Sequence, residues 1–169
     1  MKPLAFIDVD GVLNRSVSNT VARRRGYITY RTDLLGFPLK VILDPNDRRR
    51  LQRLAEHFEL AWGTTWEDEA NHVIGQLIGI SEKWPVAKNT GPSPSKAPGI
   101  RELANGRPFV WFDDEAGNED RAYLAGTDHL IIDVADNHVT AEYSWEETGL
   151  TDLHIDRAIA WAKRKENNA

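Results

Sequence analysis

Cysteine is absent from this sequence of 169 residues, and methionine occurs once. Without cysteine the chain can form no disulfide framework and can use no thiolate as a nucleophile or metal ligand. Long hydrophobic runs are also missing, because none approaches the roughly 20 residues that a membrane-spanning helix needs. The first residues lack the charged segment and the long apolar stretch of a signal peptide. We therefore expect a soluble, cytoplasmic protein that makes no membrane contact.

The charge is slightly acidic overall but uneven along the chain. The formal net charge is −5, which argues against indiscriminate binding of nucleic acid over the whole surface. Residues 14–50 nevertheless hold nine Lys or Arg residues against three acids, with two concentrated runs, Arg23-Arg24-Arg25 and Arg48-Arg49-Arg50. Each run is either a solvated face or a surface that faces an anion, and the sequence leaves both interpretations open.

The first apolar run of the chain ends in two carboxylates. Residues 4–7 are uniformly apolar, which favours a short strand buried on both faces of a parallel sheet. Asp8 and Asp10 follow, and side chains two positions apart on an extended chain point the same way. Two such carboxylates repel each other unless a divalent cation, such as Mg²⁺, neutralises them. Gly11 then allows a tight turn and lets the backbone approach a bound group.

Two later runs end in polar residues in the same manner. Residues 59–66 form the second strand candidate, which ends in the hydroxyls of Thr64 and Thr65, and residues 108–112 lead directly to Asp113 and Asp114. Core strands normally end in neutral turn residues, so a second apolar strand that ends in paired carboxylates indicates a function. The carboxyl ends of parallel strands meet at one edge of an α/β sheet, where ligands bind.

The segment Asp8-Val9-Asp10-Gly11-Val12 resembles the first motif of the haloacid dehalogenase (HAD) superfamily of phosphotransferases. Thr64 matches the second motif of that family, an apolar strand that ends in Ser or Thr. Asp113 and Asp114 resemble the acidic fourth motif. Each motif is short, but together they occur in the order that the family has.

The third HAD motif is a Lys near the start of the helix that precedes the fourth motif. Lys96 fits this place, because Ser95 can cap a helix and Pro98 is tolerated in its first turn. Lys88, in the preceding proline-rich loop, is the alternative. We favour Lys96, because a helix start fixes the direction of a side chain better than the interior of a loop does.

The resemblance implies a phosphohydrolase that works through an aspartyl-phosphate intermediate. Asp8 would attack phosphorus, and Asp10 would protonate the leaving group and then activate water. Thr64, Lys96 and the backbone N–H of Thr65 would bind phosphoryl oxygens.

The resemblance also implies a Mg²⁺ cofactor and a substrate-binding edge. The metal would be held by Asp8, by the backbone carbonyl of Asp10, and by Asp113 or Asp114, and the sequence does not decide which of the last two binds directly. Gly11 is expected to lie at the edge where the substrate binds.

The order of the elements predicts one α/β domain over residues 1–169. We expect a Rossmann-like, mainly parallel sheet with helices on both faces. Residues 14–44 show no helical period but contain two β-prone runs, 27–30 and 39–43, which predict a small flap or minimal cap after the first strand. A helix is expected over about residues 67–78, with acids in its first turn.

The basic segment suggests a substrate larger than one phosphate group. A nucleotide or a phosphorylated nucleic-acid end would fit, with Arg23, Arg24 and Arg25 as substrate-binding residues. The alternative is a non-catalytic HAD-like domain that binds a protein partner through its basic flap. The paired carboxylates and the lysine argue against this alternative, since a binding module has no use for that arrangement of charges.

Overall fold

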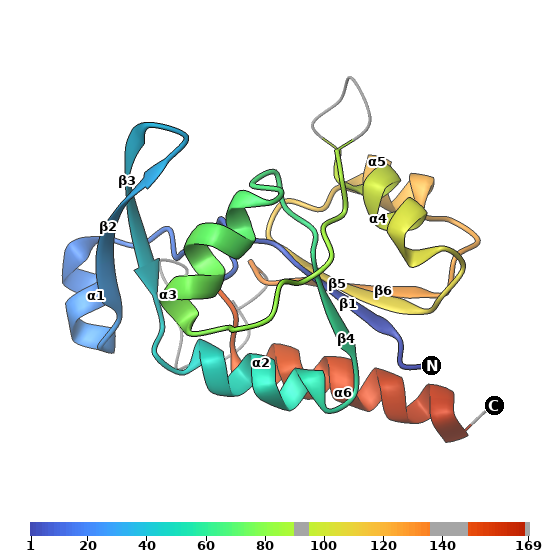
Figure 1. Ribbon diagram of the computed structural model, residues 1–169. Coiled ribbons are helices and arrows are strands. Elements are labelled where there is room, and N and C mark those ends of the chain that lie inside the picture. Colours follow the sequence, from blue (N-terminus) through green and yellow to red (C-terminus); the bar gives the residue numbers. More distant parts are fainter. Residues whose placement is uncertain (90–94, 136–148, 168–169) are drawn as a thin grey trace.

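The computed structural model describes residues 1–89, 95–135 and 149–167. Within them, one sheet is formed by the strands β1 (Leu4–Ile7), β4 (Glu59–Trp62), β5 (Phe109–Asp113) and β6 (His129–Asp133). Their order across the sheet is β4-β1-β5-β6 (Figure 1). Every pairing among these four strands is parallel, as the buried apolar runs predict.

Helices flank the sheet, and the predicted α/β architecture is confirmed. They are α2 (Asp47–Ala55), the π-helical turn η1 (Ala70–Gly75), α3 (Gln76–Ile78), α4 (Ala97–Ala104), α5 (Asn118–Tyr123) and α6 (Asp152–Asn167). Figure 1 shows α2 and α6 along one side of the sheet and α4 with α5 on the other. The arrangement is compatible with a Rossmann-like fold.

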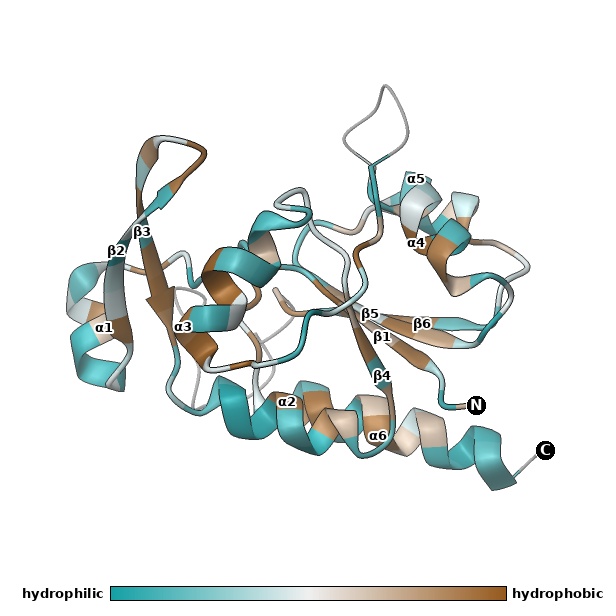
Figure 2. Cartoon of the chain, viewed as in Figure 1, coloured by the Kyte–Doolittle hydropathy of each residue, from teal (hydrophilic) through white to brown (hydrophobic). Residues whose placement is uncertain are grey.

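The strands bury apolar side chains on both faces, which explains their continuous apolar runs. Ala5 and Ile7 of β1 belong to a cluster that includes residues of α2, α6, η1 and α3. Leu4 and Phe6, the alternate residues of the same strand, pack in a second cluster with Ile100 of α4. Figure 2 shows the hydrophobic colour along the strands and on the inner sides of the helices. The sheet is therefore the middle layer between two cores.

A hairpin follows β1, as the two β-prone runs predict. Its strands, β2 (Ile28–Leu34) and β3 (Phe37–Leu43), pair antiparallel and form a separate two-stranded sheet. Figure 1 shows the hairpin projecting beside the main body. It occupies the segment for which a flap was expected.

The same segment also contains a helix, α1 (Asn19–Arg25), and the expectation of no helix there was wrong. The Ser18 side chain accepts a hydrogen bond from the Val21 backbone N–H at 3.2 Å, and Gly26 ends the helix in a left-handed conformation. Only Val21 and Ala22 are buried. Two apolar residues are too few to produce a visible helical period, so capping residues were the only usable signal.

The helix expected from residue 67 begins later. Glu67 has a left-handed backbone conformation, with φ of 49°, which interrupts a regular helix at that point. Its carboxylate accepts the backbone N–H of Asn89 at 3.1 Å, and the carboxylate of Asp68 pairs with Lys88. These two acids therefore hold the loop at residues 88–89 instead of filling the first turn of a helix.

A network of buried ion pairs joins the hairpin segment to the main body. The side chains of Arg15 and Asp47 pair where the chain leaves β1 and where α2 begins. Arg50 donates to Asp44 at 2.6 Å and to Asp47 at 3.0 Å, and its Nε lies 3.3 Å from Asp152 of α6. Of the run Arg48–Arg50, Arg50 is therefore a structural residue with buried partners.

Among the described residues, no helix combines the length and apolar character that crossing a bilayer requires.

Candidate active site

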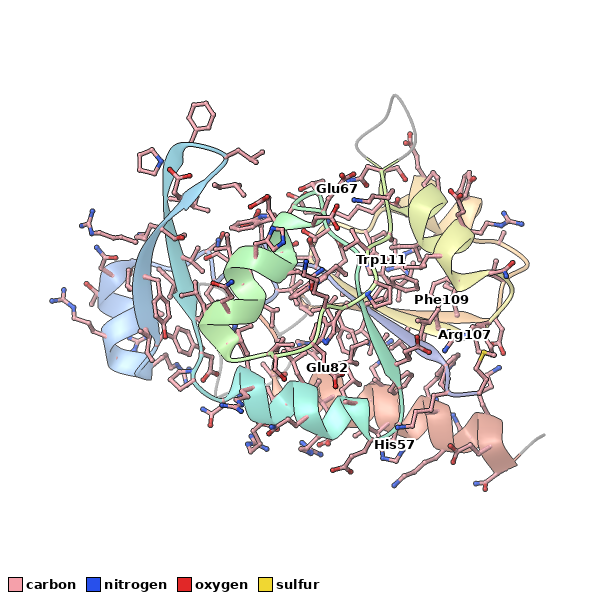
Figure 3. The ribbon with its side chains drawn as sticks, viewed as in Figure 1. His57, Glu67, Glu82, Arg107, Phe109 and Trp111 are labelled. Atoms are coloured by element: carbon pink, nitrogen blue, oxygen red, sulfur yellow. The ribbon has the colours of Figure 1, made fainter. Side chains whose placement is uncertain are left out.

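The candidate site lies where the strand order reverses direction. The chain passes from β1 to β4 on one side of it and returns as β5 on the other side. Such a reversal leaves a crevice at the carboxyl ends of the strands. Figure 3 shows His57 and Glu67 at opposite ends of β4, and Glu67 marks the end at which the site is formed.

Three aspartates come together at this edge. Asp8 follows β1, Asp113 ends β5, and Asp114 comes next. Each offers a carboxylate oxygen, and these oxygens all lie within 4.8 Å of one another. Asp8 and Asp113 are buried, with 3% and 1% exposure. Three clustered carboxylates are the kind of oxygen donors that Mg²⁺ prefers.

Lys96 bridges the two buried carboxylates. Its Nζ donates to Asp8 Oδ2 at 2.6 Å and to Asp113 Oδ2 at 2.7 Å. The other oxygen of each carboxylate accepts a backbone N–H, from Val9 at 2.8 Å and from Glu115 at 2.8 Å. One ammonium beside three carboxylates leaves negative charge in excess when all are ionised. The donor set therefore fits a divalent cation.

The protonation equilibria of the site reflect this excess of negative charge. The pKa of Asp8 is raised from 3.8 to about 7, because the effect of burial outweighs the opposing charge of Lys96 and the charge of Asp113 adds to the increase. Burial and the neighbouring Asp113 also raise the pKa of Asp114. Burial alone would lower the pKa of Lys96, but the charges of Asp8 and Asp113 outweigh it, and the pKa is raised. Lys96 is thus held as an ammonium ion.

Lys96, and not Lys88, reaches the carboxylates. Lys96 occupies the N-cap position of α4, immediately before Ala97, so the helix directs its side chain toward the ends of β1 and β5. Ser95, which was expected to be the cap, instead donates its hydroxyl to Asp120 at 2.7 Å. Lys88 pairs with Asp68 and Glu67, and its side chain is 49% exposed.

Thr64 lies where the sequence places it, after β4 and beside Asp8. The residue is 1% exposed, and its hydroxyl hydrogen-bonds the Asp8 carboxylate, which lowers the pKa of Asp8 against the larger effect of burial. Thr65 is exposed. The Thr64 hydroxyl and the backbone N–H of the next residue, just after the end of a strand, are a suitable pair of donors for an oxyanion.

Gly11 allows the side chain of Asp114 to approach the turn after β1 closely. The glycine has φ of 75°, and a Cβ at this position would overlap the Asp114 carboxylate. The glycine thus lets Asp114 lie against the turn after β1.

Asp10 lies outside the three-carboxylate cluster, and its side chain has two partners that sequence reasoning missed. Trp66 Nε1 donates to Asp10 Oδ2 at 2.7 Å, and Asn14 Nδ2 donates to Asp10 Oδ1 at 2.8 Å. Trp66 is largely buried, with 7% exposure. Two features of the sequence could have indicated these partners. Trp66 is two residues after Thr64, and Asn14 is four residues after Asp10.

A pocket of about 200 Å³ opens beside Lys96 and Asp113. It is lined by residues of β5, of the segment that follows β5, and of the start of α4 and α5, namely Ser95, Lys96, Trp111, Asp113, Glu115, Glu119 and Asp120. Figure 3 labels Trp111 on β5. The pocket offers space next to the buried carboxylates.

Arg23, Arg24 and Arg25 do not join this group of residues. They form the last turn of α1 and are exposed. Figure 1 shows α1 at the outer edge of the molecule, apart from the ends of β1, β4 and β5. A contact with a substrate at the carboxylate cluster would require an extended substrate.

A comparison of the chain with models of protein families gave no match, and a comparison with curated proteins gave none either. The resemblance to HAD phosphotransferases therefore stays a prediction from short motifs. Asp8, Thr64, Lys96, Asp113 and Asp114, which belong to four separate segments of the chain, nevertheless lie at one edge of the sheet.

Proposed function

We propose that this protein is a Mg²⁺-dependent phosphohydrolase of the HAD type that forms an aspartyl-phosphate on Asp8. The observation that carries the proposal is the pair of hydrogen bonds from Lys96 Nζ to Asp8 and Asp113, at 2.6 and 2.7 Å, within the three-carboxylate cluster. A nucleophilic carboxylate, a fixed cation and further metal-binding carboxylates are the components that phosphoryl transfer needs.

The reaction has two steps that share Asp8 and Asp10. An oxygen of Asp8 attacks phosphorus, the bond from phosphorus to the ester oxygen breaks, and the leaving oxygen takes a proton from Asp10. Water then attacks the phosphorus of the aspartyl-phosphate and gives a proton to Asp10. The bond from phosphorus to Asp8 breaks, and inorganic phosphate leaves.

The other residues of the site hold charge in place. Lys96 would neutralise a phosphoryl oxygen beside Asp8, and the Thr64 hydroxyl and Thr65 N–H would donate to the remaining oxygens. Asp8, the backbone carbonyl of Asp10, and Asp113 or Asp114 would hold Mg²⁺. Bound Mg²⁺ would neutralise the negative charge of the carboxylates and of the phosphoryl group.

For the substrate we propose an extended phosphorylated anion, a nucleotide or a phosphorylated nucleic-acid end. The exposed basic residues of α1 and of the hairpin support this class, since Arg23, Arg24, Arg25, Arg31 and Lys40 are all exposed. Replacing Arg23 to Arg25 with Ala should raise KM for such substrates and leave KM for a small aryl phosphate unchanged. Equal losses on both substrates would argue against this substrate class.

The test of the activity is hydrolysis of p-nitrophenyl phosphate with MgCl₂ or with EDTA. We expect Mg²⁺-dependent turnover by the wild type and none by Asp8→Asn. Asp128→Asn is the matched control, because it makes the same chemical change at an acid that pairs with Lys165 before β6. Turnover that survives Asp8→Asn would contradict the proposal.

An inactive wild type calls for a second measurement, thermal unfolding with fluoroberyllate and Mg²⁺. Stabilisation of the wild type but not of Asp8→Asn would indicate an enzyme selective for another phosphate ester. No stabilisation would favour the alternative, a HAD-like domain that binds a partner through its basic hairpin.

A further inference from the structure

The Asp10 carboxylate is held at both of its oxygens. Oδ2 accepts the indole N–H of Trp66 at 2.7 Å, and Oδ1 accepts the side-chain amide of Asn14 at 2.8 Å. Asp10 is an exposed residue, and water could satisfy its oxygens without any protein donor. Two side-chain donors on an exposed carboxylate therefore fix its orientation instead of satisfying a buried group.

Trp66 is placed by the turn that follows β4. Its backbone N–H donates to Thr64 Oγ1 at 3.3 Å, and the N–H of Glu67 donates to the Thr64 backbone oxygen at 3.3 Å. Glu67 is in the left-handed region, which closes the turn. The indole is 7% exposed, so packing restricts its rotation. Trp66 thereby fixes the distance between Thr64 and the carboxylate of Asp10.

Asn14 connects Asp10 to the hairpin. The Asn14 side-chain oxygen accepts the backbone N–H of Ile42 in β3 at 2.9 Å, while its amide nitrogen donates to Asp10. The backbone oxygen of Asn14 also accepts the N–H of Gly11 at 2.9 Å. Because both ends of the amide are used, the Asn14 side chain has one orientation in which all these bonds form.

Trp62, the last residue of β4, provides an internal comparison four positions before Trp66. Its indole Nε1 donates to Asn71 Oδ1 at 2.8 Å, and the same Asn71 oxygen accepts the backbone N–H of Trp84 at 2.9 Å. That bond ties together two packed segments and involves no carboxylate of the site. The two tryptophans thus use the same donor for different purposes.

We propose that Trp66 and Asn14 are positioning residues that hold the Asp10 carboxylate in the orientation needed for proton transfer to and from the substrate. This inference rests on the proposed function. The terminal torsion of an aspartate is broad, so an unrestrained Asp10 would spend much of its time turned away from the leaving oxygen. Orienting the carboxylate during folding removes that entropic cost from the catalytic step.

The test compares two substrates that differ in their need for a proton. A nitrophenolate leaves without protonation, whereas an alkoxide from an alkyl phosphate needs a general acid. We expect Trp66→Phe to lower kcat/KM by about 30-fold for glycerol phosphate, a part of the roughly 10²- to 10⁴-fold that general-acid catalysis contributes, and by less than about 3-fold for p-nitrophenyl phosphate. The comparison uses kcat/KM because Asp10 also activates water in the second step, which both substrates share, and slowing that step lowers kcat and KM together without changing kcat/KM.

Three further variants distinguish a loss of positioning from a general loss of stability. Trp62→Phe makes the same substitution at the end of β4, where the indole N–H donates to Asn71, and it should affect both substrates equally. Asn14→Asp keeps the acceptor for Ile42 and removes the donor to Asp10, and it should reproduce the selective loss on glycerol phosphate. In an Asp10→Asn background, Trp66→Phe should have no further effect, because the two residues act as one unit.

The outcomes separate this inference from the proposed function. Equal losses on both substrates, or additive effects with Asp10→Asn, would overturn the positioning role while leaving the phosphohydrolase intact. A wild type that hydrolyses neither phosphate ester and binds no fluoroberyllate would overturn both.

Discussion

Lys96 Nζ donates to Asp8 Oδ2 at 2.6 Å, although the two residues are separated by 88 positions in the chain. The contact joins the start of α4 to the end of β1, and a second bond to Asp113 joins it to β5. The site is therefore assembled at the junction of three elements that pack around the sheet. Both the stability of the folded protein and the proposed activity of the site should therefore depend on Lys96.

We predict that Lys96→Met abolishes the proposed phosphatase activity and destabilises the metal-free protein. Asp8 and Asp113 are buried, so loss of their cation leaves charge without compensation, at a cost of roughly 3 kcal/mol. Urea unfolding in EDTA measures this cost. The control is Lys88→Met, which removes an ion pair whose lysine is 49% exposed and should cost less than about 1 kcal/mol. Equal costs for the two variants would show that the Lys96 pairs contribute no special stability.

The stability of the metal-free protein should fall as pH rises through the range in which Asp8 titrates. The pKa of Asp8 is about 7 in the folded chain and 3.8 ordinarily, so between these values the folded state binds more protons than the unfolded state. Stability contributed by protonated Asp8 is complete below about pH 4 and is lost as pH approaches 7. Asp8→Asn carries no such titration.

The free energy of unfolding of Asp8→Asn, relative to that of the wild type, should therefore change with pH in a defined way. In EDTA the variant should be more stable than the wild type by roughly 2 to 4 kcal/mol at pH 8, with the advantage nearly gone at pH 4. Mg²⁺ at pH 8 should stabilise the wild type and reduce the difference. Denaturant unfolding at the two pH values measures it, with Asp128→Asn expected to follow the wild type. A pH-independent difference would contradict the raised pKa.

Gly11→Ala tests the close approach of Asp114 to the turn after β1. Both Gly11 and Gly26 have positive φ, at 75° and 72°, but a Cβ at Gly26 meets nothing within 4 Å. Both alanine variants should lose about 1 kcal/mol from backbone strain. Only Gly11→Ala should also weaken Mg²⁺ binding, because it displaces the Asp114 carboxylate. Calorimetric titration with Mg²⁺ measures this, and equal affinities in the two variants would count against a metal role for Asp114.

Arg15 should anchor the hairpin segment to the body of the protein. Its guanidinium is buried, pairs with Asp47, and donates to the backbone oxygens of Leu13 and Leu150 at 2.6 and 2.8 Å. Arg15→Met should cost about 3 to 5 kcal/mol, because it leaves Asp47 without one of its buried cations. Arg49→Met, at a pair whose arginine is 52% exposed, should cost less than about 1 kcal/mol. Thermal unfolding of the two variants distinguishes these values.

Local sequence patterns were sufficient to predict the sheet. Short apolar runs predicted parallel strands buried on both faces. Strands β1 and β5 are buried throughout, and β4 is buried except at Glu59. The order of these runs predicted helices on both sides. The two β-prone runs predicted the hairpin, but α1 escaped detection because only two of its residues are buried. Hydrophobic periodicity does not reveal a helix that buries so few of its residues.

Local patterns are enough to identify the residues that follow the strands at the site, namely Asp8 and Asp10, Thr64, and Asp113 with Asp114. Which side chains these residues contact depends on the three-dimensional packing of the chain. This packing brought Lys96 rather than Lys88 to Asp8, gave Asp10 the donors Trp66 and Asn14, and buried Arg50 among acids. A strand end is encoded by neighbouring residues, whereas a contact between side chains far apart in the chain depends on how helices pack on the sheet, which short patterns do not specify.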